Sequence, residues 1–87
     1  MRVALACGRA RLELDLPDVP PATVAQALAL ARARRPELAA GWADEEGRLR
    51  ESLAVFVNGE HVRYREGLAT VLGEGDSIYV IPLITGG

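Results

Sequence analysis

The Asn58-Gly59 pair in "LAVFVNGEHVRY" (residues 53–64) is the sequence feature that most restricts the fold. Both central positions of a type I′ turn need positive φ, which asparagine and glycine adopt more readily than other residues. The residues before the pair are apolar and include β-branched and aromatic types, as in strands. We therefore predict a β-hairpin over residues 53–64, with its turn at Asn58-Gly59.

Three further segments predict strands: "RVALA" (residues 2–6), "RLELDL" (residues 11–16) and "SIYVIPL" (residues 77–83). In residues 11–16, leucines alternate with charged residues at a period of two, so the leucines should face the core and the charged side chains water. Gly8 offers a turn between the first two strands, and "GEGD" (residues 73–76) is typical of a tight turn before the last one.

The strands at residues 2–6 and 11–16 are predicted to form a first hairpin. One helix is predicted between this hairpin and the one at residues 53–64. Thr23 and Gln26 have the spacing of a capping box, in which each side chain binds a free amide of the first helical turn. Pro36 should end the helix near Arg34 or Arg35. The buried stripe is predicted to consist of Val24, Ala27, Leu28 and Ala31. A helical turn around Leu38 and another in residues 68–72 are also expected. This order of elements predicts an α+β fold with one helix across a mixed sheet.

Length and charge restrict the classes of function. A chain of 87 residues forms one domain, residues 1–87, with room for one small core. The net charge of −2 with mixed signs argues against a nucleic-acid or membrane binder. No stretch approaches the ~20 apolar residues of a membrane span, so we expect a cytoplasmic protein.

The residues that often carry chemistry have no companions at useful spacing. His61 is the one histidine and lies in a polar segment, and Cys7 is the one cysteine and ends an apolar strand. Trp42 is expected to cover the core rather than bind a ligand. We therefore predict no metal site and no residue that acts as a general acid or base.

The last residues, "IPLITGG" (residues 81–87), combine an apolar run with two glycines. The segment follows a predicted strand directly, so it should project from a rigid base. Leu83 to Gly87 would reach at most about 17 Å when extended, at ~3.4 Å per residue. Glycine leaves a terminal carboxylate unshielded. We predict that residues 83–87 form a flexible reactive tail whose functional group is the carboxylate of Gly87.

Together, "AVFVNGE", "GEGDSIYVIPL" and the final "TGG" resemble the ubiquitin-like (β-grasp) sulfur carriers, and the resemblance covers essentially the whole chain. It implies a β-grasp fold with an extended C-terminal Gly-Gly tail. The likeness to the small subunit of molybdopterin synthase is closer than that to the carrier of the thiamine pathway. Leu83 and Ile84 follow Pro82 where that subunit would be expected to have a second proline or a smaller residue.

The resemblance implies a carrier that has no catalytic centre of its own and binds no cofactor. A ubiquitin-activating-type enzyme would use ATP to adenylate the Gly87 carboxylate, and sulfur would displace AMP to leave a thiocarboxylate. The large subunit of molybdopterin synthase would then accept the sulfur in molybdenum cofactor biosynthesis. Gly86, Thr85, Ile84 and Leu83 would bind in the partners' channels with Gly87.

Strand parity adds a docking surface to this picture. Val55 and Val57 should face the helix and Phe56 the open face, because side chains alternate along a strand. By the same rule, Ile78 and Val80 are predicted to be buried and Tyr79 and Ile81 exposed. In the ubiquitin-like arrangement the two strands are neighbours. Phe56 and Ile81 would then form an exposed apolar patch at the root of the tail, where partners bind.

Other functions remain open on the sequence alone. The same tail could supply sulfur for thiamine, cysteine or tRNA thiolation. The protein could instead be a ubiquitin-like modifier that forms isopeptide bonds to lysines of other proteins. All ten of its basic residues are arginine, so it could not form lysine-linked chains on itself. A plain interaction domain is the third possibility.

Overall fold

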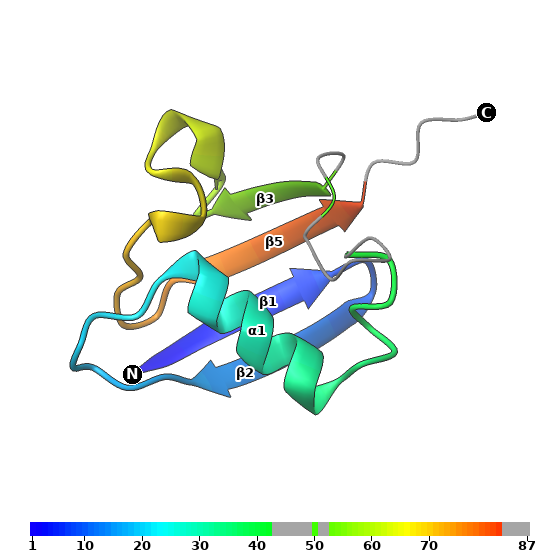
Figure 1. The fold of residues 1–87 in the computed structure, drawn as a ribbon, viewed down its shortest axis with the longest axis horizontal. Coiled ribbons are helices and arrows are strands. Elements are labelled where there is room, and N and C mark those ends of the chain that lie inside the picture. Colours follow the sequence, from blue (N-terminus) through cyan, green and yellow to red (C-terminus); the bar gives the residue numbers. More distant parts are fainter. Residues whose placement is uncertain (43–49, 51–52, 83–87) are drawn as a thin grey trace.

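The computed structural model describes residues 1–42, 50 and 53–82. Its strands are β1 (Arg2–Cys7), β2 (Ala10–Asp15), β3 (Leu53–Val57), β4 (Glu60–His61) and β5 (Ser77–Pro82). They form one sheet in the order β2-β1-β5-β3-β4, in which β1 and β5 run parallel and the other neighbours antiparallel. One helix lies across one face of this sheet (Figure 1). The prediction of an α+β fold with a mixed sheet is confirmed.

Helix α1 (Val24–Arg34) begins at the predicted capping box. The Thr23 hydroxyl oxygen accepts a hydrogen bond from the Gln26 amide at 3.4 Å, and Gln26 Oε1 accepts one from the Thr23 amide at 2.9 Å. These bonds satisfy two amides that the first helical turn leaves free. The predicted stripe of Val24, Ala27, Leu28 and Ala31 is fully buried. Among the described residues, no helix is long and apolar enough to cross a membrane.

The core lies between α1 and the sheet and includes Trp42. The indole is fully buried within the same cluster as Leu5, Leu28 and Val80. Trp42 therefore covers the core, as predicted. Its Nε1 is buried and has no hydrogen-bond partner among the residues that the structure describes.

The Asn58-Gly59 turn has the predicted backbone, with φ of 51° at Asn58 and 87° at Gly59. The Asn58 side chain also joins this turn to the start of β5. Its Nδ2 donates to Asp76 Oδ1 at 3.0 Å, and its Oδ1 accepts from the Ser77 amide at 3.0 Å. This asparagine therefore sets the backbone of one turn and ties it to the neighbouring strand.

The second strand of this hairpin is shorter than predicted. The chain leaves the sheet after His61 and enters a 3₁₀ turn, η1 (Val62–Tyr64). His61 Nδ1 accepts a hydrogen bond from the Arg63 amide at 3.0 Å, which caps the turn. The expectation of a strand up to Tyr64 was wrong, because a local side-chain bond of this kind competes with strand pairing.

The segment before β5 contains a helical turn, η2 (Gly67–Ala69), which begins and ends earlier than the expected residues 68–72. Thr70 follows it and is 2% exposed. Its hydroxyl donates to the Gly67 carbonyl at 2.7 Å and accepts from the Glu66 amide at 3.1 Å. Its carbonyl accepts from the Val24 amide at 3.0 Å, so this loop satisfies another free amide at the start of α1.

Candidate functional site

Strand β5 leads from the centre of the sheet to the predicted reactive tail. It pairs in parallel with β1 on one side and antiparallel with β3 on the other (Figure 1). The strand therefore has ladder hydrogen bonds on both edges. The tail residues predicted to react or bind are Leu83, Ile84, Thr85, Gly86 and Gly87, and they lie outside the residues that the structure describes.

The face of the sheet opposite α1 has the side chains that parity predicts. Val55 and Val57 are 3% and 0% exposed, whereas Tyr79 and Ile81 are 54% and 42% exposed. Phe56 is half-buried. The prediction that Phe56 and Ile81 face away from the helix is confirmed. Their role in binding a partner stays a prediction.

The register shows how these side chains are arranged. Phe56 lies directly opposite Tyr79, and Ile81 lies opposite Ala54. Phe56 and Ile81 are therefore diagonal neighbours, with Tyr79 between Phe56 and β1. We call Phe56, Tyr79 and Ile81 the open-face patch. Alternation along the strand predicts that Tyr79 is exposed, but its place beside Phe56 depends on the register of β3 against β5.

The patch continues along β4 into η1. His61 is the cross-strand partner of Phe56, and their rings meet edge to face with centroids 5.0 Å apart. Tyr64, which is 73% exposed, makes a second edge-to-face contact with His61 at 6.3 Å. This extension is not among the predicted features. A two-residue turn at Asn58-Gly59 pairs residue 56 with residue 61, so the signal was present in the hairpin.

The remaining candidate residues do not form a reactive cluster. Cys7 is half-buried and packs against the core. Within the described part of the chain, no group of three or more His, Cys, Asp or Glu side chains could hold a metal ion. The hydrogen bond from Arg35 lowers the pKa of the Glu37 carboxyl, and this pair lies just after α1 rather than on the open face.

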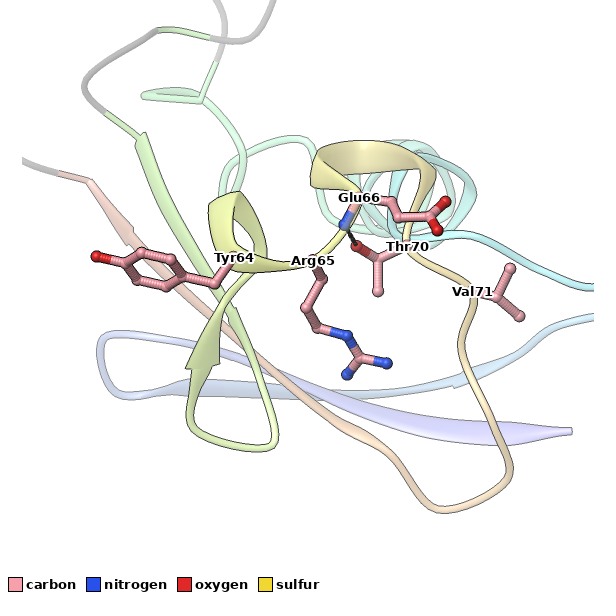
Figure 2. Close-up of a pocket in the computed structure, with 5 residues that line it drawn as sticks. All are labelled: Tyr64, Arg65, Glu66, Thr70 and Val71. Carbon is pink, nitrogen blue, oxygen red and sulfur yellow. Dashed lines mark hydrogen bonds between the residues drawn. The ribbon is translucent and has the colours of Figure 1, made fainter.

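A hollow of about 450 Å³ lies beside η1 and is drawn in Figure 2. The Tyr64 ring points away from the other lining residues, and the side chains of Glu66 and Val71 project on the opposite side. Arg65 extends between them and pairs with Glu60 at 3.8 Å. These polar groups do not converge on a common point, so the hollow does not resemble a binding site for a small molecule.

A sequence model of the ThiS family matches residues 9–87. The sulfur carrier protein CysO of Mycobacterium tuberculosis is 42% identical over 41 residues, which cover 47% of this chain and 44% of that protein. In each of the curated relatives, the match spans less than half of the relative's own length.

Solved structures extend the likeness to the whole fold. SAMP1 of Haloferax volcanii superposes with a TM-score of 0.82 at 22% identity, and the match covers 100% of both chains. A chain of the Amycolatopsis orientalis BexX/CysO complex superposes with a TM-score of 0.74 at 26% identity. That match covers 98% of this chain and 99% of the other. The first of these likenesses concerns the fold alone.

Proposed function

The chain belongs to the ThiS family, and from that premise we propose that it is a sulfur carrier whose Gly87 carboxylate becomes a thiocarboxylate. The observation that carries the proposal is the family match over residues 9–87, which includes the two final glycines. The identity to the sulfur carrier protein CysO also supports it. The open-face patch, which includes Tyr79 and Ile81 of β5, gives a partner protein a surface to bind.

The proposed reaction has two steps at the Gly87 carbonyl. An adenylating enzyme of the ubiquitin-activating type joins the carboxylate to the α-phosphate of ATP and releases pyrophosphate. A sulfur nucleophile at the oxidation level of sulfide then forms the C–S bond, and AMP leaves with the electrons of the broken C–O bond. Gly86 and Gly87 have no side chains to obstruct the approach of the nucleophile. ATP is consumed by the partner, so the carrier itself needs no cofactor.

We propose that partner proteins bind the open-face patch while the tail enters their active sites. Phe56, Tyr79 and Ile81 offer apolar surface, and large aromatic side chains are common anchors in protein interfaces. Ile81 lies next to Pro82 at the end of β5. Docking there would fix the start of the tail, and Leu83, Ile84 and Thr85 would then extend into the partner's channel.

The finer proposal is that the chain serves as the small subunit of molybdopterin synthase, with the large subunit as its acceptor. The Gly-Gly ending after "IPLIT" supports this pathway by its likeness to that subunit. The identity to CysO supports a second candidate, a carrier that delivers sulfur to a different acceptor. In both cases the adenylation of Gly87 consumes ATP, and we expect the protein to act in the cytoplasm.

Intact-mass spectrometry tests the carrier chemistry. The full chain is incubated with an adenylating enzyme, ATP and sodium sulfide, and we expect a mass increase equal to replacement of one oxygen by sulfur. A chain that lacks Gly87 should show no such change. An equal increase in both chains would contradict the proposal. Release of the sulfur on addition of molybdopterin synthase large subunit and its pterin precursor would then separate the two pathways.

A further inference from the structure

One arginine lies in the same row of the sheet as the open-face patch. Arg11 of β2 is opposite Ala6 of β1, and Ala6 is beside Tyr79 of β5. Tyr79 in turn is opposite Phe56 of β3. Arg11 is exposed while the next residue, Leu12, packs against the core, so Arg11 belongs to the face of the sheet away from α1. The row therefore runs across β2, β1, β5 and β3.

The residue between Arg11 and Tyr79 in this row is small. Ala6 is 8% exposed and has only a methyl side chain. Neighbouring strands are about 4.8 Å apart, so the backbone of Arg11 lies roughly 10 Å from that of Tyr79. A protein interface of ordinary size buries about 800 Å² of each partner, an area several strands wide. A partner that covers Tyr79 therefore reaches Arg11 as well.

The other charged side chains on this face of β2 have partners within the chain. Glu13 and Asp15 both pair with Arg2, at 3.6 and 3.3 Å. Arg11 forms no hydrogen bond or ion pair with any residue that the structure describes. Its guanidinium keeps its N–H donors for a group from outside the chain. The unpaired side chain on this face of β2 is thus the one in the row of the patch.

We propose that Arg11 binds a carboxylate of the partner protein that covers the open-face patch. A charge that is enclosed in an interface without a counterion costs free energy, so a well-matched partner presents the opposite charge there. The planar guanidinium can hold a carboxylate through two parallel hydrogen bonds. The matching surface of the partner is therefore apolar over the patch and acidic beside Arg11. The inference rests on the proposed carrier function, in which the adenylating enzyme is the partner.

This charge gives the docking surface a direction. Apolar contact is non-directional, so the open-face patch alone discriminates weakly between orientations of a partner. One end of the row is Arg11, whereas the other end is the aromatic extension at His61 and Tyr64. A carboxylate on Arg11 therefore fixes how the partner is oriented on the sheet. Because Tyr79 and Pro82 belong to the same strand, that orientation also decides where the partner's channel meets the tail.

Calorimetric titration of the full chain with the adenylating enzyme of the same organism tests the site. We expect Arg11→Gln to raise the dissociation constant about tenfold, the usual scale for loss of a charged hydrogen bond. Arg32→Gln is the matched control. Arg32 is an exposed residue of α1, on the opposite face of the sheet (Figure 1), and has no hydrogen bond or ion pair with the described residues. Its loss should change the dissociation constant by no more than about twofold. Equal dissociation constants for the two variants would overturn the inference.

Rate constants separate a specific pair from a general effect of charge. Loss of a paired charge inside an interface speeds dissociation, whereas loss of a charge at the rim mainly slows association. We expect Arg11→Gln to dissociate about tenfold faster in surface plasmon resonance, and Arg11→Glu to bind more weakly still because it repels the partner's carboxylate. Thermal unfolding of each variant should match wild type, since Arg11 has no partner in the described chain to lose. A loss confined to the association rate, or an Arg11→Glu variant that binds like wild type, would contradict the site.

The outcome for this site is distinguishable from the outcome for the proposed function. Thiocarboxylate formation by the wild type, together with wild-type affinity of Arg11→Gln, would reject the role of Arg11 and leave the carrier function standing. Absence of both enzyme binding and thiocarboxylate in the wild type would reject both. Thiocarboxylate formation by the wild type with about tenfold weaker binding of Arg11→Gln, and not of Arg32→Gln, is the result we expect.

Discussion

Replacing Ile81 with aspartate should separate partner binding from folding more clearly than any other change on the open face. Ile81 is 42% exposed, lies opposite Ala54 and is next to the last described residue of β5. Full burial of an isoleucine contributes about 1.5–3 kcal/mol, so a partner that covers this exposed fraction gains about 0.6–1.3 kcal/mol. Ile81→Asp removes that gain.

The variant also places an unpaired carboxylate in the interface, which costs roughly 1–3 kcal/mol more. The sum is about 2–4 kcal/mol, or a dissociation constant raised roughly 30-fold to nearly a thousandfold. Isothermal titration calorimetry with the adenylating enzyme measures this loss directly. On the same scale the buried remainder of the side chain contributes about 0.9–1.7 kcal/mol to folding, so the free energy of unfolding should fall by about 1–2 kcal/mol.

Val71→Asp is the control for this experiment. Val71 is also β-branched and is 54% exposed, but it lies in the loop before β5, beside the hollow of Figure 2. Its substitution adds the same charge away from the open face, so binding should stay within about twofold of wild type. Equal losses for Ile81→Asp and Val71→Asp would refute the assignment of the open-face patch as the docking surface.

Three further predictions concern other parts of the molecule. Thr23→Ala removes one half of the capping box and should cost about 1 kcal/mol, which lowers the melting temperature by roughly 4–8 °C; an unchanged melting temperature in calorimetry would show that the cap adds no stability. Cys7→Ser should leave thiocarboxylate formation within about threefold of wild type in the mass assay, because the thiol packs against the core; a hundredfold loss in the folded variant would give Cys7 a chemical role, since it equals roughly 2.7 kcal/mol. Gly59→Ala should destabilise the fold by about 1 kcal/mol in denaturant titration, because its φ of 87° suits glycine alone; equal stability would mean that the turn relaxes.

Local signals predicted most of the fold. The Thr23–Gln26 spacing located the start of α1, because a capping box depends only on residues within one helical turn. Alternation along β3 and β5 assigned Phe56 and Ile81 to the open face, because that pattern depends only on the direction of successive side chains.

Features that depend on the pairing of distant strands, or on competition between side-chain and backbone hydrogen bonds, could not be predicted from local sequence. The position of Tyr79 beside Phe56 follows from the register of two strands that are separated by nineteen residues of chain. The end of β4 at His61 follows from a side-chain bond to Arg63 that competes with the sheet. The extension of the open-face patch from Phe56 over His61 to Tyr64 combines both effects, so it required the structure.

The place of β5 in the sheet also has a mechanical consequence. An enzyme that draws the tail into a channel pulls on β5 along its length, and the strand is hydrogen-bonded to β1 and β3 on its two edges. A pull in this direction shears both ladders at once, so many hydrogen bonds share the force and none has to break before the others. A strand at the edge of the sheet, peeled from one end, would lose its bonds one after another. A partner can therefore pull on the tail and release it over repeated cycles without unfolding the sheet.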